Sequence, residues 1–251
     1  MIPTKTCLID GIGNFTIPEN EPCDIWVNWE KPIMEYVVKK LSDKGGKAYF
    51  IDVGANVGYF SVWAATRAKM VYSIEPNPNA YDILGVNSYL VRTDLGHDIE
   101  ICNIALSNTD RVGQIYYRDL ANGDGRLYDP KIGNPCDGNR YNIRNVPVMT
   151  LSSFQQMYCG NHRIDMIKID CEGSEYEILQ DLSFFGDKKN EGCEVVLEIH
   201  GSIMKMRGLN VENFVNYLDS KFEIRDLHGN IVTGCKIPIQ GHLSLKYRGQ
   251  K

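Results

Sequence analysis

The sequence lacks the features that mark several common classes of protein. No apolar run approaches the roughly 20 residues of a membrane-spanning helix, and the first residues carry no long apolar region of the signal-peptide type. The net charge is −5, so the chain has no general attraction for nucleic acids or anionic membranes. We therefore expect a cytoplasmic protein with no membrane span and no nucleic-acid partner.

Several nucleotide, zinc and redox motifs are missing as well. Neither the dinucleotide fingerprint G-x-G-x-x-G nor the phosphate loop G-x-x-x-x-G-K-[ST] occurs. No C-x-x-C pair suggests a zinc or redox site. The chain is too long for a disulfide scaffold, and Cys102, Cys171 and Cys193 fall in or beside predicted core strands. We therefore expect reduced, mostly buried thiols.

The organising feature that is present is a strand–turn–helix–strand pattern between residues 48 and 75. Two short apolar runs have the composition of buried parallel strands. Between them, Gly54 and Gly58 allow the backbone to approach a ligand, and a helix start offers free N–H groups. Glu75 follows Gly54 by 21 residues, where an acid can accept hydrogen bonds from a ribose. The pattern predicts a nucleotide-type site, with a plain βαβ unit and a chance acid as the alternative.

Two motifs resemble those of a known enzyme family. D-V-G-A-N-V-G-Y-F-S at residues 52–61, followed by I-E-P-N at 74–77, resembles the first two motifs of class I S-adenosylmethionine-dependent methyltransferases. K-I-D-C-E-G-S-E at 168–175 is similar to the K-I-D-x-E-G-x-E motif of the FkbM family in that superfamily. The resemblance covers roughly residues 49 to 200. It implies S-adenosylmethionine as cofactor, S-adenosylhomocysteine as product, and O-methylation of a small-molecule hydroxyl, typically of a sugar, a glycan or a natural product.

The alternation of predicted strands and helices indicates one α/β domain over residues 1–251. By resemblance, its fold is the Rossmann-like class I methyltransferase fold, a mostly parallel seven-stranded sheet with helices on both faces. Residues 1–46 end in an amphipathic helix and are expected to form a helical cap segment, packed on the sheet or over the cofactor site. The expected strands are residues 49–53, 70–74, 98–103, 113–118, 146–150, 164–169, 193–199, 221–224 and 242–247.

The segment 119–145 breaks this alternation. It is rich in glycine and asparagine, and loops longer than about 12–15 residues are usually functional or disordered. Its arginines and tyrosines are able to stack on a sugar and to hydrogen-bond it. We expect an acceptor-side loop, with a disordered surface insertion as the open alternative. These side chains are Arg126, Tyr128, Arg140, Tyr141 and Arg144.

Cofactor contacts are expected in the glycine turn and at the ends of the neighbouring strands. Glu75 is expected to bind the ribose. Asn77 is expected to cap a helix that begins at Pro78 and runs to about Val91, so it needs no ligand. By resemblance, two strand-end residues lie beside the adenine, although a plain strand end explains either; these are Asn103 and Ala105. The full set is Asp52, Gly54, Ala55, Asn56, Gly58, Glu75, Asn103, Ala105 and Asp170.

Three titratable side chains at strand ends are the candidates for catalysis. Asp170 and Glu172 follow one predicted strand and His200 follows the next, at the edge where parallel sheets bind ligands. His200 has an ordinary pKa suited to accepting a proton near neutrality, and Asp170 could orient it. A structural histidine is the alternative. Ser174 and Glu177 fit a capping box, S-x-x-E, which removes Glu177 from the catalytic set.

Other functions remain open at this point. Asp170, Glu172 and Glu198 could bind a divalent cation that lowers the pKa of the acceptor hydroxyl, which the sequence does not decide. The [DNS]-P-P-[YF] motif of many amino-group methyltransferases is absent, which favours an oxygen acceptor. An NAD-linked oxidoreductase is disfavoured by Asn56 and the missing third glycine. A non-catalytic nucleotide-binding module is the remaining alternative, and nothing indicates the oligomeric state.

Overall fold

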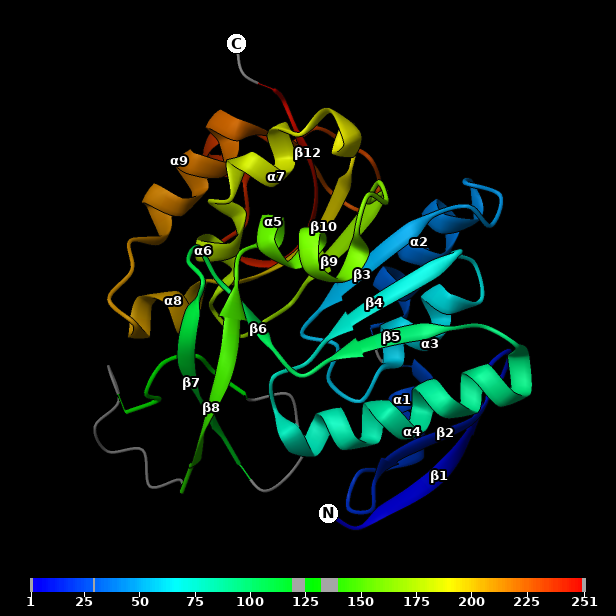
Figure 1. Cartoon of the computed structure of the whole chain (residues 1–251). Coiled ribbons are helices and arrows are strands. Elements are labelled where there is room, and N and C mark those ends of the chain that lie inside the picture. The colour runs from blue at the N-terminus through cyan, green and yellow to red at the C-terminus, as the bar shows by residue number, and fades with distance from the viewer. Residues whose placement is uncertain (1, 29, 119–124, 132–139, 250–251) are drawn as a thin grey trace.

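A seven-stranded sheet forms the centre of the molecule (Figure 1). The computed structural model describes residues 2–28, 30–118, 125–131 and 140–249. Within these residues the strand order is β11-β12-β10-β9-β3-β4-β5, and neighbours are parallel except for β12, which is antiparallel to β10 and β11. The prediction of a mostly parallel seven-stranded sheet is confirmed. The strands are β3 (Tyr49–Val53), β4 (Met70–Ile74), β5 (Ile99–Cys102), β9 (Met166–Ile169), β10 (Glu194–His200), β11 (Phe222–Arg225) and β12 (Gln240–Tyr247).

Helices cover both faces of this sheet, because successive side chains of a strand point to opposite sides. On β3, Phe50 packs in one hydrophobic core with α2 and α3, whereas Ile51 packs in another core with α5 and α9. None of the described helices is long and apolar enough to cross a membrane. The first core contains α2 (Lys31–Ser42), α3 (Tyr59–Ala65) and α4 (Pro78–Leu95), and the second contains α5 (Leu151–Phe154), α6 (Glu175–Leu179), α7 (Leu182–Gly186), α8 (Gly201–Met206) and α9 (Val211–Lys221).

Helix α4 begins as predicted. The Asn77 side chain accepts a hydrogen bond from the N–H of Asn79 at 3.0 Å, and Pro78 is the first helical residue. The helix continues to Leu95, past its predicted end. Gly96 then adopts the left-handed conformation, with a φ of 72°, and ends the helix.

The first 46 residues contain strands as well as helices, which differs from the helical segment expected. An antiparallel hairpin of β1 (Thr4–Ile9) and β2 (Gly13–Pro18) precedes α1 (Cys23–Asn28) and α2. The hairpin lies beside α4 (Figure 1). In β1, buried Cys7 and Ile9 alternate with exposed side chains. This pattern spans only six residues, so its signal in the sequence is weak.

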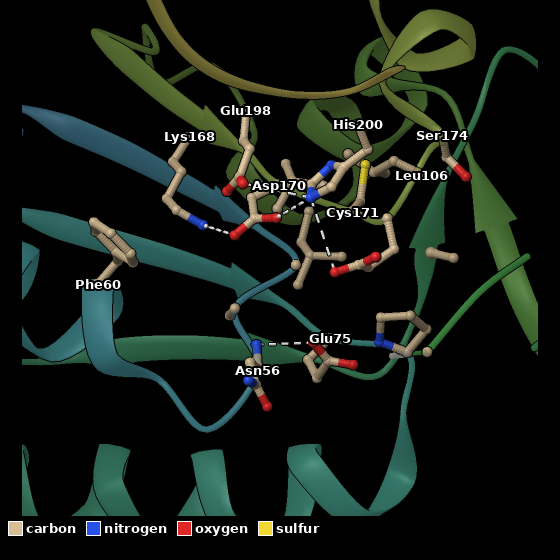
Figure 2. Close-up of a pocket in the computed structure, with 18 of the residues that line it drawn as sticks. Asn56, Phe60, Glu75, Leu106, Lys168, Asp170, Cys171, Ser174, Glu198 and His200 are labelled. Atoms are coloured by element: carbon tan, nitrogen blue, oxygen red, sulfur yellow. Dashed lines mark hydrogen bonds and ion pairs between the residues drawn. The ribbon is translucent and has the colours of Figure 1, made fainter. Parts of the chain in front are cut away.

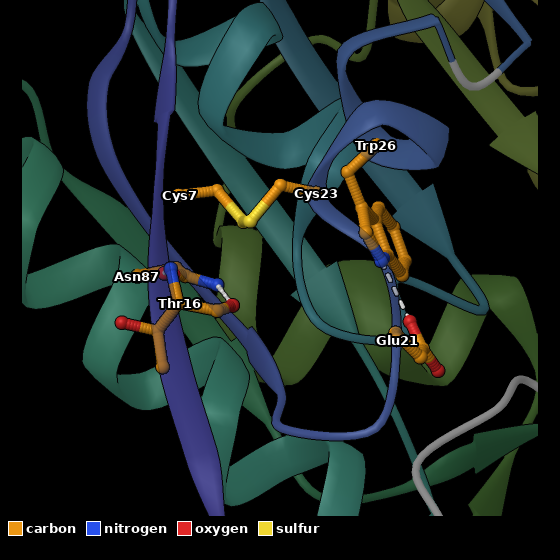
Figure 3. Close-up of a disulfide and its surroundings, with 6 residues drawn as sticks. All are labelled: Cys7, Thr16, Glu21, Cys23, Trp26 and Asn87. Atoms are coloured by element: carbon orange, nitrogen blue, oxygen red, sulfur yellow. Dashed lines mark hydrogen bonds between the residues drawn. A yellow bond between two sulfur atoms is a disulfide. The ribbon is translucent and has the colours of Figure 1, made fainter.

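A disulfide ties the hairpin to α1 and corrects the expectation of reduced thiols (Figure 3). Cys7 on β1 is bonded to Cys23, the first residue of α1, 16 positions later. The other cysteines of the described residues are free. No spacing motif marks the pair, because the fold of the hairpin brings the two thiols together. Disulfides are typical of oxidising compartments, so this bond does not favour the expected cytoplasmic location.

Asn87 of α4 connects the hairpin to the turn after β3, and Figure 3 shows it beside Thr16 of the hairpin. Its Oδ1 accepts a hydrogen bond from the N–H of Thr16 at 2.7 Å, and its Nδ2 donates to the carbonyl of Thr16 at 2.9 Å. The same Nδ2 donates to the carbonyl of Val57 at 2.7 Å. One buried amide therefore fixes the hairpin, α4 and the glycine turn relative to one another.

A second, three-stranded sheet contains β6 (Ala105–Leu106), β7 (Arg111–Tyr117) and β8 (Asn142–Met149), in the order β6-β8-β7. Strand β8 begins inside the segment 119–145, for which the sequence predicts a loop. The backbone of Arg126 also pairs with Tyr116 of β7. The described parts of the segment are thus partly strand-like, and residues 119–124 and 132–139 lie outside the described residues.

The capping box predicted before α6 is wrong. Ser174 precedes the helix, but its side chain makes no capping hydrogen bond to a described group. Glu177 binds the guanidinium of Arg207 instead. A charge-assisted pair is stronger than a neutral hydrogen bond, so Glu177 pairs with Arg207 rather than with the backbone N–H of Ser174. The short remaining helical segments are η1 (Gln155–Cys159), η2 (Lys188–Asn190) and η3 (Gly234–Lys236).

Candidate functional site

A cavity lies at the carboxyl ends of β3, β4, β9 and β10, the edge where open parallel sheets bind ligands (Figure 2). The N-terminal segment adds Trp26 and Glu30 to its wall, and the segment after β7 adds Gly125 and Leu127. The other described lining residues are Val53, Gly54, Ala55, Asn56, Tyr59, Phe60, Ile74, Glu75, Pro76, Ala105, Leu106, Lys168, Asp170, Cys171, Glu172, Ser174, Glu198 and His200.

The glycine turn after β3 is shaped by the protein around it. Gly54 has a φ of +78°, and a Cβ there would lie 1.8 Å from the carbonyl oxygen of Asp170. Gly58 has a φ of +96°, and its Cβ would lie 2.7 Å from Cδ1 of Leu84 on α4. Both glycines are thus required by left-handed backbone and by close neighbours in the chain. The approach of a ligand, for which the sequence predicts these glycines, is not needed to explain either of them.

Glu75 ends β4 with its carboxylate beside this turn (Figure 2). Its Oε2 accepts a hydrogen bond from the N–H of Asn56 at 2.8 Å, and its Oε1 accepts one from the N–H of Asn77 at 2.7 Å. The side chain is buried, and this burial raises the pKa of Glu75 to about 7 in spite of the two backbone hydrogen bonds. Two backbone donors thus hold an acid at the position where the sequence predicts ribose binding.

Three of the nine predicted cofactor contacts lie outside the described lining of the cavity. Asp52 is fully buried beneath it and accepts a hydrogen bond from the Ser61 hydroxyl at 2.6 Å. Asn103 donates to the backbone carbonyl of Glu75 at 2.8 Å, so it supports the end of β4. Gly58 is the third. The remaining six line the cavity: Gly54, Ala55, Asn56, Glu75, Ala105 and Asp170.

His200 lies at the centre of an acidic cluster (Figure 2). Its Nδ1 is 2.8 Å from Oε1 of Glu175, a fully buried carboxylate. Its Nε2 is 3.8 Å from oxygens of Asp170 and Glu172, and 3.5 Å from Oε1 of Glu198. Burial lowers the pKa of His200, but the hydrogen bond to Glu175 and the surrounding negative charge outweigh it and raise the pKa to about 9. A histidine that already carries a proton is a poor general base, so the geometry does not favour the base role predicted for it.

Lys168 fixes the outer side of the same cluster. Its Nζ is 2.8 Å from Oδ2 of Asp170 and 4.4 Å from the centre of the Phe60 ring. Burial lowers the pKa of Lys168, but the charges of Asp170 and Asp52 more than offset this and raise it. For Asp170, burial raises the pKa and the Lys168 ammonium lowers it further than that, so the carboxylate stays ionised. A buried ion pair therefore holds Asp170 in one orientation.

Two residues from distant parts of the chain extend the cluster. Glu30 precedes α2 in a left-handed conformation, and its Oε1 is 3.7 Å from Nε2 of His242 on β12. The same His242 nitrogen is 3.0 Å from Oε2 of Glu198. Burial raises the pKa of Glu30 to about 7. Neither residue was predicted from the sequence, because the two are 212 positions apart and no local pattern links them.

The segment after β7 meets the other side of the cluster. Nη2 of Arg126 is 3.9 Å from Oε2 of Glu172, and burial raises the pKa of Glu172 to about 7. The guanidinium groups of Arg126 and Arg207 lie 6.0 and 4.8 Å from the centre of the Tyr128 ring. Described residues of the predicted acceptor-side loop therefore lie at the cavity, and the loop's role stays a prediction.

The described residues that line the cavity include several that the sequence did not predict. Trp26 packs its ring 6.0 Å from that of Tyr59 and donates from Nε1 to Oε2 of Glu21 at 2.6 Å (Figure 3). Lys168 was within reach of prediction, because it opens the K-I-D motif and is a charged residue in an apolar strand. Trp26 has no comparable signal, since only the disulfide-linked N-terminal fold brings it to the cavity.

Comparisons with known proteins agree with these observations. The family model described as "Methyltransferase FkbM domain" matches residues 52–227, about 70% of the chain. A curated relative, "Methyltransferase sdnD" from Sordaria araneosa, is 25% identical over 154 residues, which cover 53% of this chain. The chain spans 59% of the length of that relative.

Solved structures with similar folds include two methyltransferases. Methyltransferase FkbM from Methylobacillus flagellatus KT has a TM-score of 0.49 and 13% identity, over 80% of this chain and 44% of that chain. A putative O-methyltransferase from Klebsiella pneumoniae has a TM-score of 0.49 and 9% identity, over 93% of this chain and 84% of that chain.

Proposed function

The chain belongs to the FkbM methyltransferase family, and from this premise we propose that it is an S-adenosylmethionine-dependent O-methyltransferase. Its acceptor is a hydroxyl group of a small molecule, either a sugar or glycan or a natural product. The observation that carries the proposal is the cavity itself. It joins a buried acid beside a glycine turn, Glu75, to a cluster of carboxylates and a histidine at the neighbouring strand ends.

The residues on the glycine-turn side of the cavity fit S-adenosylmethionine. Both carboxylate oxygens of Glu75 are held by backbone N–H groups, which leaves acceptor capacity for the ribose hydroxyls. Gly54 brings the turn against the backbone of Asp170, so the glycine turn adjoins the carboxylate side of the cavity. Apolar Ala105 and Leu106 offer a surface for the adenine. The cofactor supplies an electrophilic methyl group on a sulfonium.

The carboxylate side of the cavity performs two tasks in this proposal. It positions the acceptor hydroxyl, and one of its oxygens accepts the proton that the hydroxyl loses. Asp170 and Glu172 both line the cavity, and Lys168 keeps Asp170 ionised. The apolar wall, which includes Trp26 and Leu127, excludes water from the reacting groups.

A sugar acceptor is supported by the polar side chains beside the cluster. Arg126 and Tyr128 stack near Glu172, and such planar groups bind sugar rings through stacking and hydrogen bonds. The Nε of Arg126 and the hydroxyl of Tyr128 are buried without a hydrogen-bond partner among the described residues. A polar ligand that reached these two atoms would supply the partner that they lack among the described residues.

Calorimetry and a turnover assay test this function against its alternatives. We expect S-adenosylmethionine and S-adenosylhomocysteine to bind and NAD not to bind. Transfer of a labelled methyl group to one of a panel of free sugars should follow, and Glu75→Ala should weaken cofactor binding. Glu223→Ala removes a half-buried carboxylate of β11, which is paired with Arg225 outside the cavity, and serves as the control. Binding of NAD alone would indicate an oxidoreductase, and cofactor binding without turnover on any acceptor would favour a non-catalytic module.

A further inference from the structure

The acidic edge of the cavity contains a set of atoms arranged as metal ligands. One ligand atom each from Asp170, Glu198 and His200 lies within 4.8 Å of the other two, and their side chains point toward one another (Figure 2). We propose that these three residues bind one divalent first-row transition-metal cation. The set replaces Glu172, one of the metal candidates from the sequence, with His200.

Each of the three ligands is held from behind by a partner on its other polar atom. Lys168 binds Oδ2 of Asp170 at 2.8 Å, which leaves Oδ1 toward His200. The other nitrogen of the imidazole, Nδ1, is bound to buried Glu175 at 2.8 Å. A carboxylate behind a histidine is the usual support of a metal-bound imidazole, because it fixes the ring and its tautomer.

Glu198 is held in the same way. Its Oε2 is 3.0 Å from Nε2 of His242, whereas its Oε1 faces His200 at 3.5 Å. The inner atoms of the three residues are thus too far apart for good hydrogen bonds, whose N···O distances are about 2.7–3.2 Å. A cation placed among them would contact all three. A second group that could bind a metal consists of Glu30, Glu198 and His242. Its histidine is already bonded to Glu198, so we assign a single cation, to Asp170, Glu198 and His200.

The charge of the cluster also favours a cation, which would take the place of the proton on the inward nitrogen of His200. Five carboxylates meet here, while the permanent cations in contact with them among the described residues are Lys168 and Arg126. Buried anions are stable only when they are paired or bind a metal. The sulfonium and ammonium of S-adenosylmethionine could offset part of this charge, but neither would use the inward nitrogen of His200. The five carboxylates are Glu30, Asp170, Glu172, Glu175 and Glu198.

The donor set selects the kind of metal. Two carboxylates and one imidazole suit manganese, iron or zinc, whereas magnesium and calcium prefer oxygen ligands alone. The use of this cation in catalysis rests on the proposed function. At the acceptor side of the cavity it would bind the hydroxyl oxygen and lower its pKa, which eases loss of the proton.

Binding of Mn²⁺ to the chelator-treated full chain, without cofactor or acceptor, tests the site directly. Free Mn²⁺ gives a paramagnetic resonance signal that it loses on binding. During a titration of the chain with Mn²⁺, this signal should therefore stay absent until one equivalent has been added. Mg²⁺ should compete poorly for the site. Loss of a support residue typically costs ten- to a hundredfold in metal affinity, so loss of a ligand in Glu198→Gln should cost more than about 100-fold. Circular dichroism checks that each variant is folded.

Glu172→Gln is the matched control, because it removes the same charge from the same cluster without removing an assigned ligand. It should weaken Mn²⁺ binding by less than about tenfold, which is below the loss typical even of a residue that supports a ligand. Equal losses in the two variants would overturn the ligand assignment. Failure of the wild-type chain to bind Mn²⁺, with S-adenosylmethionine still bound, would overturn the metal site alone. Binding of Mn²⁺ without any affinity for S-adenosylmethionine would leave the site standing and overturn the proposed function.

Discussion

Replacement of Gly54 by alanine should destabilise the fold whether or not a ligand is present. The added Cβ would lie 1.8 Å from the carbonyl oxygen of Asp170, and a backbone oxygen cannot rotate away as a side chain can. The φ of +78° costs an L-residue about 1–2 kcal/mol. Relief of the overlap adds about 1–3 kcal/mol, the usual scale of overpacking. We therefore expect the free energy of unfolding to fall by about 2–5 kcal/mol, a large part of the roughly 5–15 kcal/mol of a typical domain.

Gly96→Ala is the control for this experiment. Gly96 has a φ of +72°, but no described atom lies within 4 Å of its added Cβ. This variant should lose about 1–2 kcal/mol, the cost of the left-handed backbone alone. Urea unfolding of both variants, followed by circular dichroism, measures the difference between them. If the two variants lose the same free energy of unfolding, the contact between the turn and Asp170 adds nothing to the loss, and the predicted clash at Gly54 is refuted.

Three further predictions concern the cofactor side and the N-terminal segment. Because burial raises the pKa of Glu75 to about 7 and ribose hydroxyls favour the ionised form, S-adenosylmethionine should bind more tightly as the pH rises from 6 to 8. In calorimetry, Glu75→Ala should weaken cofactor binding by about 1–3 kcal/mol and remove this pH dependence; an unchanged affinity in the folded variant would rule out ribose binding by Glu75. Asn87→Ala strands the buried backbone groups of Thr16 and should lower the free energy of unfolding by about 1–3 kcal/mol in urea, and a neutral effect would contradict its role as a connector. Reduction of the bond between Cys7 and Cys23 should lower that free energy by about 3 kcal/mol, as expected for a closed loop of this length, and equal stability of the oxidised and reduced forms would disprove the contribution.

The parts of the fold that the sequence predicts well are those with a local cause. Strand β3 is a run of apolar residues bounded by a glycine turn, and α4 begins at a capping asparagine followed by a proline. Hydrophobic period and capping chemistry act over a few residues, so a sequence window contains them. The capping box at Ser174 also had a local cause, but Arg207, from a distant helix end, supplied a stronger partner for Glu177.

The candidate site divides in the same way. The glycine turn, Glu75 and Asp170 follow strand ends, and their place could be inferred from topology alone. Trp26 and Glu30 reach the cavity through the disulfide-linked N-terminal segment, and His242 of β12 joins the acidic cluster beside it. Their positions depend on packing between distant segments, which leaves no periodic trace in the sequence. The state of His200 was equally hidden, because its proton affinity is set by Glu175 and other acids that only the fold assembles.

The place of β12 in the sheet has a consequence for how the chain is made. This strand lies between β10 and β11, although it follows both in the sequence. On the ribosome, β10 and β11 emerge first, and each presents an unpaired edge until residues 240–247 arrive. Exposed strand edges of this kind recruit other chains. The nascent protein therefore presents these two edges until β12 is inserted, and a chaperone that shields them should improve its yield more than one that acts on the finished fold.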